Sequence, residues 1–164
     1  MSTTGDELAG IVDLFGALTR PQLTDALAEL AFKQGEEVDS DAIEAAIATA
    51  LADYVLVEYD PPDDGTERER ADPLLAAGPA AFPTLPEYGE DLPHILDYEQ
   101  RAVDRDRLAE QVRERLDAEA EAAIDNGASE RAAALHDISY DLEAWGSVEV
   151  DGIRASLAAL LPGD

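Results

Sequence analysis

The sequence contains no cysteine, and this absence excludes disulfide bonds and metal sites built from thiolates. Lysine is almost absent too, because all but one of the eleven basic residues are arginine. No stretch approaches the roughly 20 consecutive apolar residues that a membrane helix needs. The first ten residues show neither the basic start nor the apolar core of a signal peptide. These absences lead us to expect a soluble, cytoplasmic protein.

Acidic residues are what the chain has in excess, since 38 Asp and Glu against 11 Lys and Arg give a formal net charge of −27. One explanation is disorder, because a high net charge with few apolar residues leaves too little burial to offset chain entropy. Against it, 46% of the residues are hydrophobic, and they recur in periodic stripes. We therefore expect most of this 164-residue chain to fold.

A second explanation of the acidity is adaptation to a hypersaline cytoplasm. Self-repulsion at this net charge opposes the compact state in dilute buffer. At molar salt the screening length is only about 3 Å, and most of that repulsion is lost. The scarcity of lysine favours a halophilic protein over an acidic mesophilic one. In a halophile, acidity is how a surface is built, so it is not in itself evidence for a basic partner.

Apolar residues at helical spacing predict a first helix over residues 6–18. Thr19 is expected to cap a second helix over residues 20–34, and Gly35 to end it. Phe32 lies off the apolar face of that helix, so we expect it to contact a second neighbouring element.

Residues 40–53 then predict an alanine-rich helix, and residues 54–59, rich in aromatic and β-branched side chains, predict a strand. The Pro-Pro-Asp-Asp-Gly sequence at 61–65 indicates a turn. Residues 66–71 could form a polar second strand that completes a hairpin. The order helix, helix, helix, strand over residues 6–71 resembles a winged-helix module, a resemblance of element order and not of a sequence motif.

The winged-helix resemblance implies a possible nucleic-acid contact. In DNA-binding members the third helix enters the major groove. Arg and Lys then contact the phosphates, while Arg, Asn or Gln reads base edges. Residues 40–53 contain none of these four residue types. The candidate nucleic-acid contacts are the nearby cations Arg20, Lys33, Arg68 and Arg70. Winged-helix modules also serve as protein-interaction domains, and the missing readout residues favour that use.

Residues 72–103 contain five prolines together with many large apolar side chains. We interpret this segment as a proline-rich arm packed on the first module; the alternative is a disordered linker. Beyond it, Asp104 is expected to start the longest helix, which ends near Asn126, and Ser129 to cap the next one. The short link between these two helices predicts an antiparallel helical hairpin, followed by a short last helix.

The densest group of basic residues, which we name the arginine cluster, lies in the same part of the chain: Arg101, Arg105, Arg107, Arg113 and Arg115. One interpretation is a site for an anion or an acidic partner. The alternative is a solvated helix laced by ion pairs, such as Glu110 with Arg113 and Arg115 with Glu119. The acids between residues 99 and 121 outnumber the arginines, which favours the ion pairs.

Catalysis has little support in the sequence. With 38 acids, carboxylate pairs arise at any spacing by chance, so none can be singled out as a general acid and base. His94 and His136 lie in no metal-binding spacing, and no phosphate-binding or nucleophile motif occurs. We expect no catalytic residue, no cofactor and no metal. Trp145, the single tryptophan, is interpreted as a core anchor, with a binding hot spot as the alternative.

Two short stretches, Phe-Gly-Ala-Leu-Thr-Arg at 15–20 and Pro-His-Ile-Leu-Asp at 93–97, resemble small acidic haloarchaeal proteins whose families carry no assigned activity. The resemblance implies a source and a compartment and no chemistry. The expected fold class is mainly α: a winged-helix-like three-helix unit with a short β-hairpin at 1–71, the arm at 72–103, and the helical hairpin with its short helix at 104–164.

The expected function is non-enzymatic protein–protein interaction, as a self-associating or regulatory adaptor protein of a halophile. The alternative is a winged-helix transcription regulator that binds DNA. An alanine-rich stripe on the C-terminal hairpin would permit close helix packing across a dimer interface. This stripe comprises Ala109, Ala120, Ala123, Ala132 and Ala133.

Overall fold

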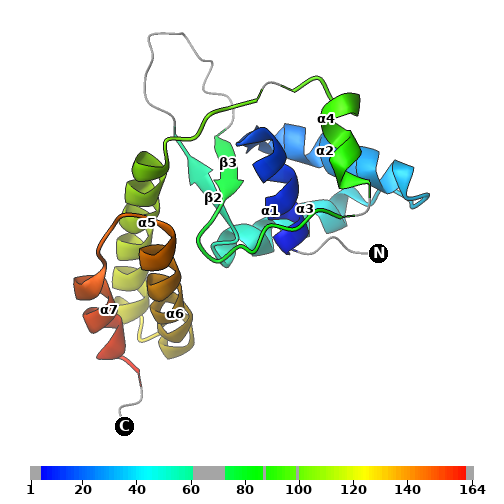
Figure 1. Ribbon diagram of the computed structural model, residues 1–164. Coiled ribbons are helices and arrows are strands. Elements are labelled where there is room, and N and C mark those ends of the chain that lie inside the picture. The colour runs from blue at the N-terminus through cyan, green and yellow to red at the C-terminus, as the bar shows by residue number, and fades with distance from the viewer. Residues whose placement is uncertain (1–4, 61–72, 87, 99, 162–164) are drawn as a thin grey trace. The chain divides into compact units, whose positions relative to one another are not determined.

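The computed structural model describes residues 5–60, 73–86, 88–98 and 100–161, and it divides the chain into two compact units. Unit 1 extends to Val103 and unit 2 begins at Asp104. The fold is mainly helical, with a small antiparallel sheet, which confirms the expected mainly α class with a short β-hairpin. Figure 1 shows the elements of both units.

Unit 1 begins with helix α1 (Gly5–Phe15), which Gly16 ends at a positive φ of 84°. The chain then forms a two-residue strand, β1 (Leu18–Thr19), and helix α2 (Arg20–Lys33). Thr19 caps α2 as expected: its side chain accepts from the backbone of Gln22 at 3.2 Å, and its own N–H donates to the Gln22 side chain at 3.1 Å.

Helix α3 (Ser40–Ala52) starts at Asp39, whose carboxylate accepts from the Ala42 N–H at 3.1 Å. Strand β2 (Leu56–Tyr59) follows, and strand β3 (Leu74–Ala77) pairs with it antiparallel, Tyr59 opposite Leu74. On its other side β3 pairs antiparallel with β1, Leu18 opposite Leu75. The strand order is therefore β1-β3-β2.

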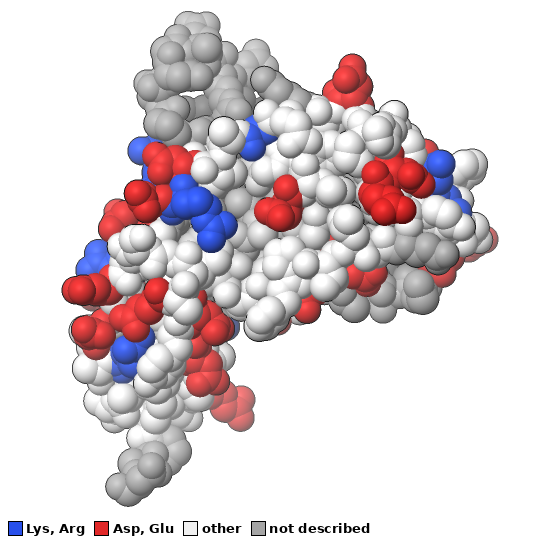
Figure 2. All heavy atoms as spheres, in the orientation of Figure 1, with Lys and Arg blue, Asp and Glu red and all other residues white. Residues whose placement is uncertain are grey.

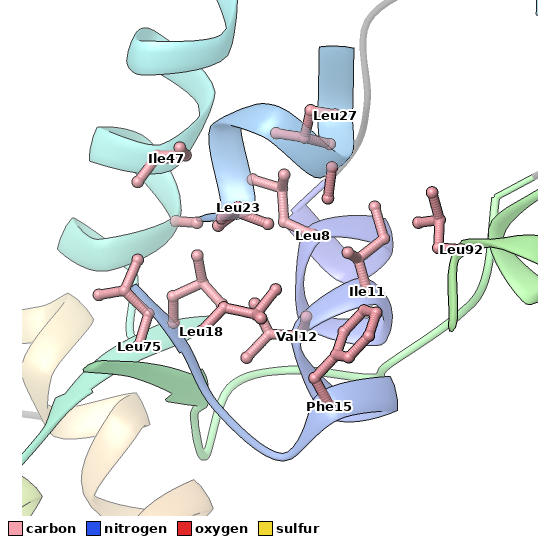
Figure 3. Close-up of a cluster of buried hydrophobic side chains, with 14 of the residues drawn as sticks. Leu8, Ile11, Val12, Phe15, Leu18, Leu23, Leu27, Ile47, Leu75 and Leu92 are labelled. Carbon is pink, nitrogen blue, oxygen red and sulfur yellow. The ribbon is translucent and has the colours of Figure 1, made fainter. Parts of the chain in front are cut away.

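The three helices and the sheet of unit 1 enclose one apolar core (Figure 3). Leu8, Ile11 and Phe15 reach it from α1, and α2 contributes Leu23 on its buried face. The side chains drawn in Figure 3 converge from elements far apart in the sequence. This convergence explains why such short elements hold together, because a helix of 11 to 14 residues is marginal in water without tertiary packing.

The segment after β3 runs over α1 and carries a 3₁₀ turn, η1 (Gly89–Asp91), and a short helix, α4 (Leu92–Ile95). Leu92 is fully buried in the core, and the Tyr98 ring packs edge-on against Phe15 with centroids 5.6 Å apart. Burial, and secondarily the charge of Asp25, raises the pKa of the Tyr98 phenol. This segment is thus part of the packing of unit 1.

Unit 2 consists of α5 (Arg105–Asp125), α6 (Ser129–Trp145) and α7 (Asp151–Ala158). Asp104 caps α5 as expected, since its carboxylate accepts from the Arg107 N–H at 3.2 Å. Helices α5 and α6 form a hairpin, and α7 packs against both of them (Figure 1). The unit has its own core, which includes Leu108, Leu116 and Leu135.

Several expected boundaries were wrong. The first helix stops at Phe15 and not at residue 18, because Gly16 turns the chain and Leu18 joins the sheet. The strand expected from residue 54 starts at Leu56, since Tyr54 is buried at a φ of 62° in the preceding corner.

Three further expectations concern Ser129, the second strand and Phe32. Ser129 is the first residue of α6 and caps nothing, because Ala128 occupies the cap position. The strand expected at 66–71 lies outside the described residues, and the partner of β2 is β3. Phe32 makes no second packing contact of the expected kind, since 76% of it is exposed.

Candidate functional site

The outward face of α3 is the candidate site that the fold of unit 1 presents. Ile47 and Ala50 turn inward and are buried, while the other side of the helix is exposed. Its exposed side chains are acidic or small: Asp41, Ala42, Glu44, Ala45, Ala48, Thr49 and Ala52. No cation and no amide side chain occurs on α3. The face therefore has carboxylates and methyl groups to offer a partner.

A shallow hollow of about 450 Å³ lies between the first turn of α1 and the exposed side of α3. Small side chains of α3, including Ala45 and Thr49, form much of its lining, and the carboxylates of Asp6 and Asp53 lie at it. Neither histidine lines this hollow. Its chemistry is that of a packing surface with acidic edges.

The candidate nucleic-acid contacts lie on α2 or outside the described residues. Arg20 is exposed at the first residue of α2 and Lys33 at the last, so the length of the helix separates them. Arg68 and Arg70 lie outside the described residues. The structure thus brings neither Arg20 nor Lys33 onto α3.

Arg101, the first member of the arginine cluster, belongs to unit 1 and holds a chain corner there. Its guanidinium donates through Nη1 to the Ala17 carbonyl at 2.9 Å and to Gln22 Oε1 at 2.8 Å. Its backbone N–H donates to the Phe15 carbonyl at 2.9 Å. These bonds connect the arm to the corner between α1 and α2, so Arg101 is a packing residue.

The other four members of the arginine cluster lie on α5 in unit 2. Arg105 stacks over the Trp145 ring, 4.4 Å from its centroid, which joins the start of α5 to the end of α6. Arg113 pairs loosely with Glu110 at 3.9 Å and donates through Nε to the Glu149 carbonyl at 3.0 Å.

Arg115 and Arg107 complete the cluster. Arg115 pairs with Glu119 at 2.8 Å, as expected, and Arg131 of α6 reaches the same carboxylate at 2.9 Å. Arg107 is exposed in the first turn of α5. The described contacts of the cluster are therefore with this chain's own carboxylates, carbonyls and aromatic ring (Figure 2 shows the acids interspersed with the arginines).

Most of the alanine stripe of the hairpin is buried inside unit 2. Ala109, Ala120, Ala123 and Ala132 are buried, and only Ala133 of the five is exposed. A Cβ placed on Gly146 would lie 2.6 Å from the Ala109 Cβ, which shows how closely the chain packs there. The small side chains let the helices of one chain approach each other, and they leave no stripe for a second copy.

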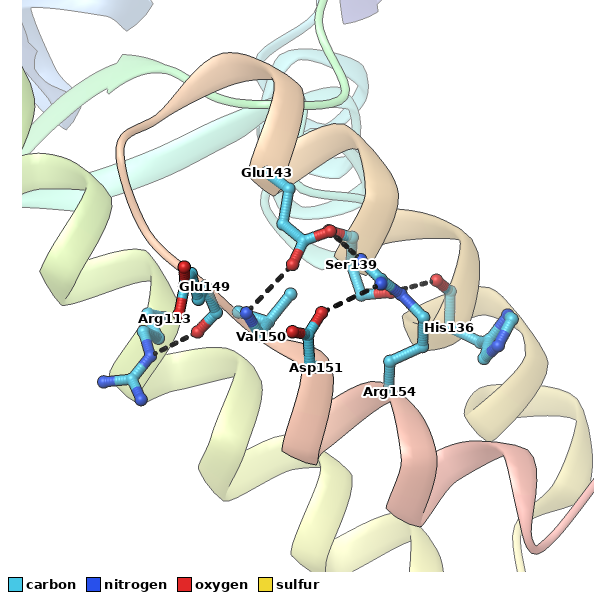
Figure 4. Close-up of polar contacts among 8 residues, drawn as sticks. All are labelled: Arg113, His136, Ser139, Glu143, Glu149, Val150, Asp151 and Arg154. Carbon is cyan, nitrogen blue, oxygen red and sulfur yellow. Dashed lines mark hydrogen bonds and ion pairs between the residues drawn. The ribbon is translucent and has the colours of Figure 1, made fainter.

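A polar cluster that the sequence did not suggest joins α6 to α7 (Figure 4). Arg154 of α7 pairs with the Glu143 carboxylate, donates through Nε to the buried Ser139 hydroxyl at 3.0 Å, and lies over the Tyr140 ring at 4.0 Å. Glu143 also accepts from the Val150 N–H at 3.1 Å. The contacts described for Arg154 and Glu143 are therefore with residues of unit 2.

The electrostatics of this cluster follow from the contacts. The hydrogen bond from Arg154 lowers the pKa of Glu143, and the Val150 N–H lowers it further. The same bond to Glu143 raises the pKa of Arg154. Burial raises the pKa of nearby Asp141, with the charge of Asp137 adding to it. Both ion-pair partners stay charged at neutral pH, as a structural bridge requires.

The two histidines belong to different units of the chain. His94 is exposed on α4 in unit 1, and His136 on α6 packs edge-on against Tyr140 with ring centroids 5.4 Å apart. Among the described residues, no three His, Asp or Glu side chains gather in a geometry that could hold a metal ion. In the same part of the chain no helix is both long and apolar enough to cross a membrane.

No curated protein and no solved structure matches the chain. A family of unknown function, DUF7109, matches residues 6–162. This match confirms the expectation of a family without an assigned activity. Because it covers nearly the whole chain, the protein belongs to the DUF7109 family.

Proposed function

We propose that this protein is a non-enzymatic protein-interaction or regulatory adaptor protein of the haloarchaeal cytoplasm, and that it self-associates. The net charge of −27 and the near-absence of lysine support the halophilic origin. Unit 1 serves in this proposal as a winged-helix-like module. The element order α1-β1-α2-α3-β2-β3 and the strand order β1-β3-β2 support that assignment.

The observation that carries the proposal is the chemistry of the exposed face of α3. In a DNA-binding module this helix would enter the major groove and meet phosphates on both sides. Asp41 and Glu44 would be repelled there, and α3 has no Arg, Lys, Asn or Gln to read a base edge. High salt reduces the repulsion but supplies no readout. A protein surface, by contrast, can pack on the methyl groups of Ala45 and Ala48.

The experiment compares two matched substitutions of exposed helical alanines in the full chain at molar KCl. Ala48→Arg changes α3 and Ala118→Arg changes α5. We expect wild type and Ala118→Arg to retain the same partner protein from haloarchaeal extract at a fixed stoichiometry, and Ala48→Arg to lose it. If Ala48→Arg retained the partner protein as well as wild type does, a role for α3 would be contradicted.

The second candidate function is a transcription regulator that binds DNA, which the same order of helices and strands favours. Fluorescence anisotropy of labelled duplexes at molar KCl tests it directly. Our proposal predicts no saturable binding. Saturable binding that is lost when Arg20, Arg68 and Arg70 are replaced by Ala would establish the regulator instead.

A further inference from the structure

Residues 78–86, which we name the strap, follow β3 and are fixed to α1 through backbone atoms. The Thr84 N–H donates to the Asp6 carbonyl at 3.1 Å, and the Phe82 N–H donates to the Asp6 carboxylate at 3.1 Å. The approach to α1 is close, since a Cβ on Gly10 would lie 1.9 Å from the Thr84 carbonyl oxygen. The strap is thus held by main-chain hydrogen bonds together with its buried prolines, Pro79 and Pro86, and with Ala81, which packs against the core.

The larger side chains of the strap point away from the core. Phe82 is 78% exposed, and Leu85 and the following Tyr88 are exposed as well. Leu85 lies over Gly89, where an added Cβ would be 3.5 Å from the Leu85 Cδ2. Three large exposed apolar side chains in one short segment, two of them aromatic, are typical of an interaction surface.

The strap is also free of charge. Residues 73–86 form the longest run of this sequence without Asp, Glu, Lys or Arg, in a chain of which 30% is charged. The segment crosses the visible face of unit 1 in Figure 1, and Figure 2 shows that area as mainly uncharged, with acidic side chains at its edges. Solubility alone would not preserve an apolar, uncharged strip on so acidic a surface.

We propose that the strap is the surface through which two copies of this chain associate. A two-fold interface brings the same patch of both copies together, so any charge near the axis faces its own copy. Each copy carries a net charge of −27, and a charged patch would add repulsion at the closest point. A strap without charges of its own adds nothing to this repulsion, which is then limited to neighbours such as the Asp6 carboxylate beside the Phe82 N–H. It also buries Phe82 against its counterpart.

This inference rests on the proposed function, because it assigns a surface to the self-association proposed there, and that surface is not the outward face of α3. The proposal predicts how dimerisation changes with salt concentration. Two like-charged copies that meet through apolar side chains associate more tightly as KCl screens their repulsion. A basic partner held by the acidic surface would instead bind more weakly as salt rises.

Sedimentation equilibrium of the full chain in molar KCl tests the proposal with a matched pair of variants. Phe82→Asp places a charge on the strap, and Phe32→Asp places one at a phenylalanine of nearly equal exposure, 76%, on α2. We expect wild type to dimerise, and Phe82→Asp to raise the dimer dissociation constant at least about tenfold. Phe32→Asp should stay within about twofold of wild type. Circular dichroism confirms that each variant is folded.

Three outcomes would overturn the proposal. The first is a wild type that stays monomeric up to a protein concentration of about 1 mM. The second is a dimer that Phe32→Asp dissociates and Phe82→Asp does not. The third is dimerisation that weakens as KCl rises, at KCl concentrations where the chain is folded. The salt dependence of dimerisation is measured on wild type alone. A monomeric chain that still retains a partner through α3 would contradict self-association and the strap, but not the interaction role of α3. Loss of both would contradict the proposed function as a whole.

Discussion

The carbonyl oxygen of Arg101 lies where a side chain on Gly16 would begin. A Cβ built on Gly16 would be 1.9 Å from that oxygen, and Gly16 has a φ of 84°. The two residues are far apart in the sequence, and the bond from the Arg101 N–H to the Phe15 carbonyl holds them together at 2.9 Å. The corner after α1 is therefore closed by the far end of the arm.

Gly16→Ala is expected to destabilise unit 1 strongly, because the new methyl group would collide with backbone and the residue would keep a left-handed conformation. The conformational strain alone costs about 1–2 kcal/mol, and displacing the arm adds to it. Gly35→Ala is the matched control, since Gly35 has a φ of 75° but nothing within 4 Å of an added Cβ. It should cost only the conformational strain of about 1–2 kcal/mol. Denaturant unfolding in molar KCl measures both, and equal costs would contradict the collision.

Arg101→Ala is expected to cost about 1–3 kcal/mol of unfolding free energy, because it removes charge-assisted bonds to Ala17 and Gln22. A double-mutant cycle with Gln22→Ala should show a coupling of about 0.5–3 kcal/mol. Arg20→Ala, which alters an exposed arginine of α2, should change stability by less than about 0.5 kcal/mol. If Arg101 served an anion site instead, its loss would leave stability unchanged and remove anion binding.

The elements that the sequence predicted well are those with local signals at both ends. Helix α5 is one, because Asp104 caps its start and the Asn126-Gly127 pair ends it, Gly127 at a positive φ of 62°. Helix α2 is another, bounded by Thr19 and by Gly35. A capping side chain and a left-handed glycine act within a few residues, so the sequence alone reveals them.

Strand β1 could not be predicted in this way. Leu18 fits the apolar spacing of the preceding helix, and only pairing with Leu75 makes it a strand. The same holds for Arg154, which gains its partners Ser139 and Glu143 when α7 packs on α6. The exposed face of α3 was foreseeable from its composition, whereas exposure of Phe82 was not, because it depends on how the strap lies over α1.

Glu143→Gln is expected to lower the melting temperature of unit 2 at neutral pH. The hydrogen bond from Arg154 holds the pKa of Glu143 below its ordinary value of 4.5. A lowered pKa in the folded state means that the ion pair stabilises at pH values above that ordinary value. The contribution is lost as pH falls through the lowered pKa of the folded state. The difference between wild type and variant should therefore vanish in acid.

Thermal unfolding of the full chain, followed across a pH series in molar KCl, checks this. Glu110→Gln is the control, because Glu110 pairs with Arg113 at 3.9 Å with both side chains exposed, and such pairs contribute little. A Glu143→Gln variant as stable as wild type at neutral pH would show that the ion pair between Arg154 and Glu143 does not stabilise unit 2.

The stability of the whole chain is expected to rise as KCl increases from millimolar to molar. The 38 acids outnumber the 11 basic residues more than threefold, and the repulsion among the acids falls as the screening length shrinks to about 3 Å. Denaturation in urea, which is uncharged, measures the unfolding free energy at each salt concentration. Sorbitol at equal osmolality is the control, because an excluded osmolyte favours burial without screening charge. A rise of the same size in sorbitol would attribute the effect to exclusion. A chain equally stable in millimolar buffer would remove the halophilic explanation, and its acidic surface would then have to be a binding surface.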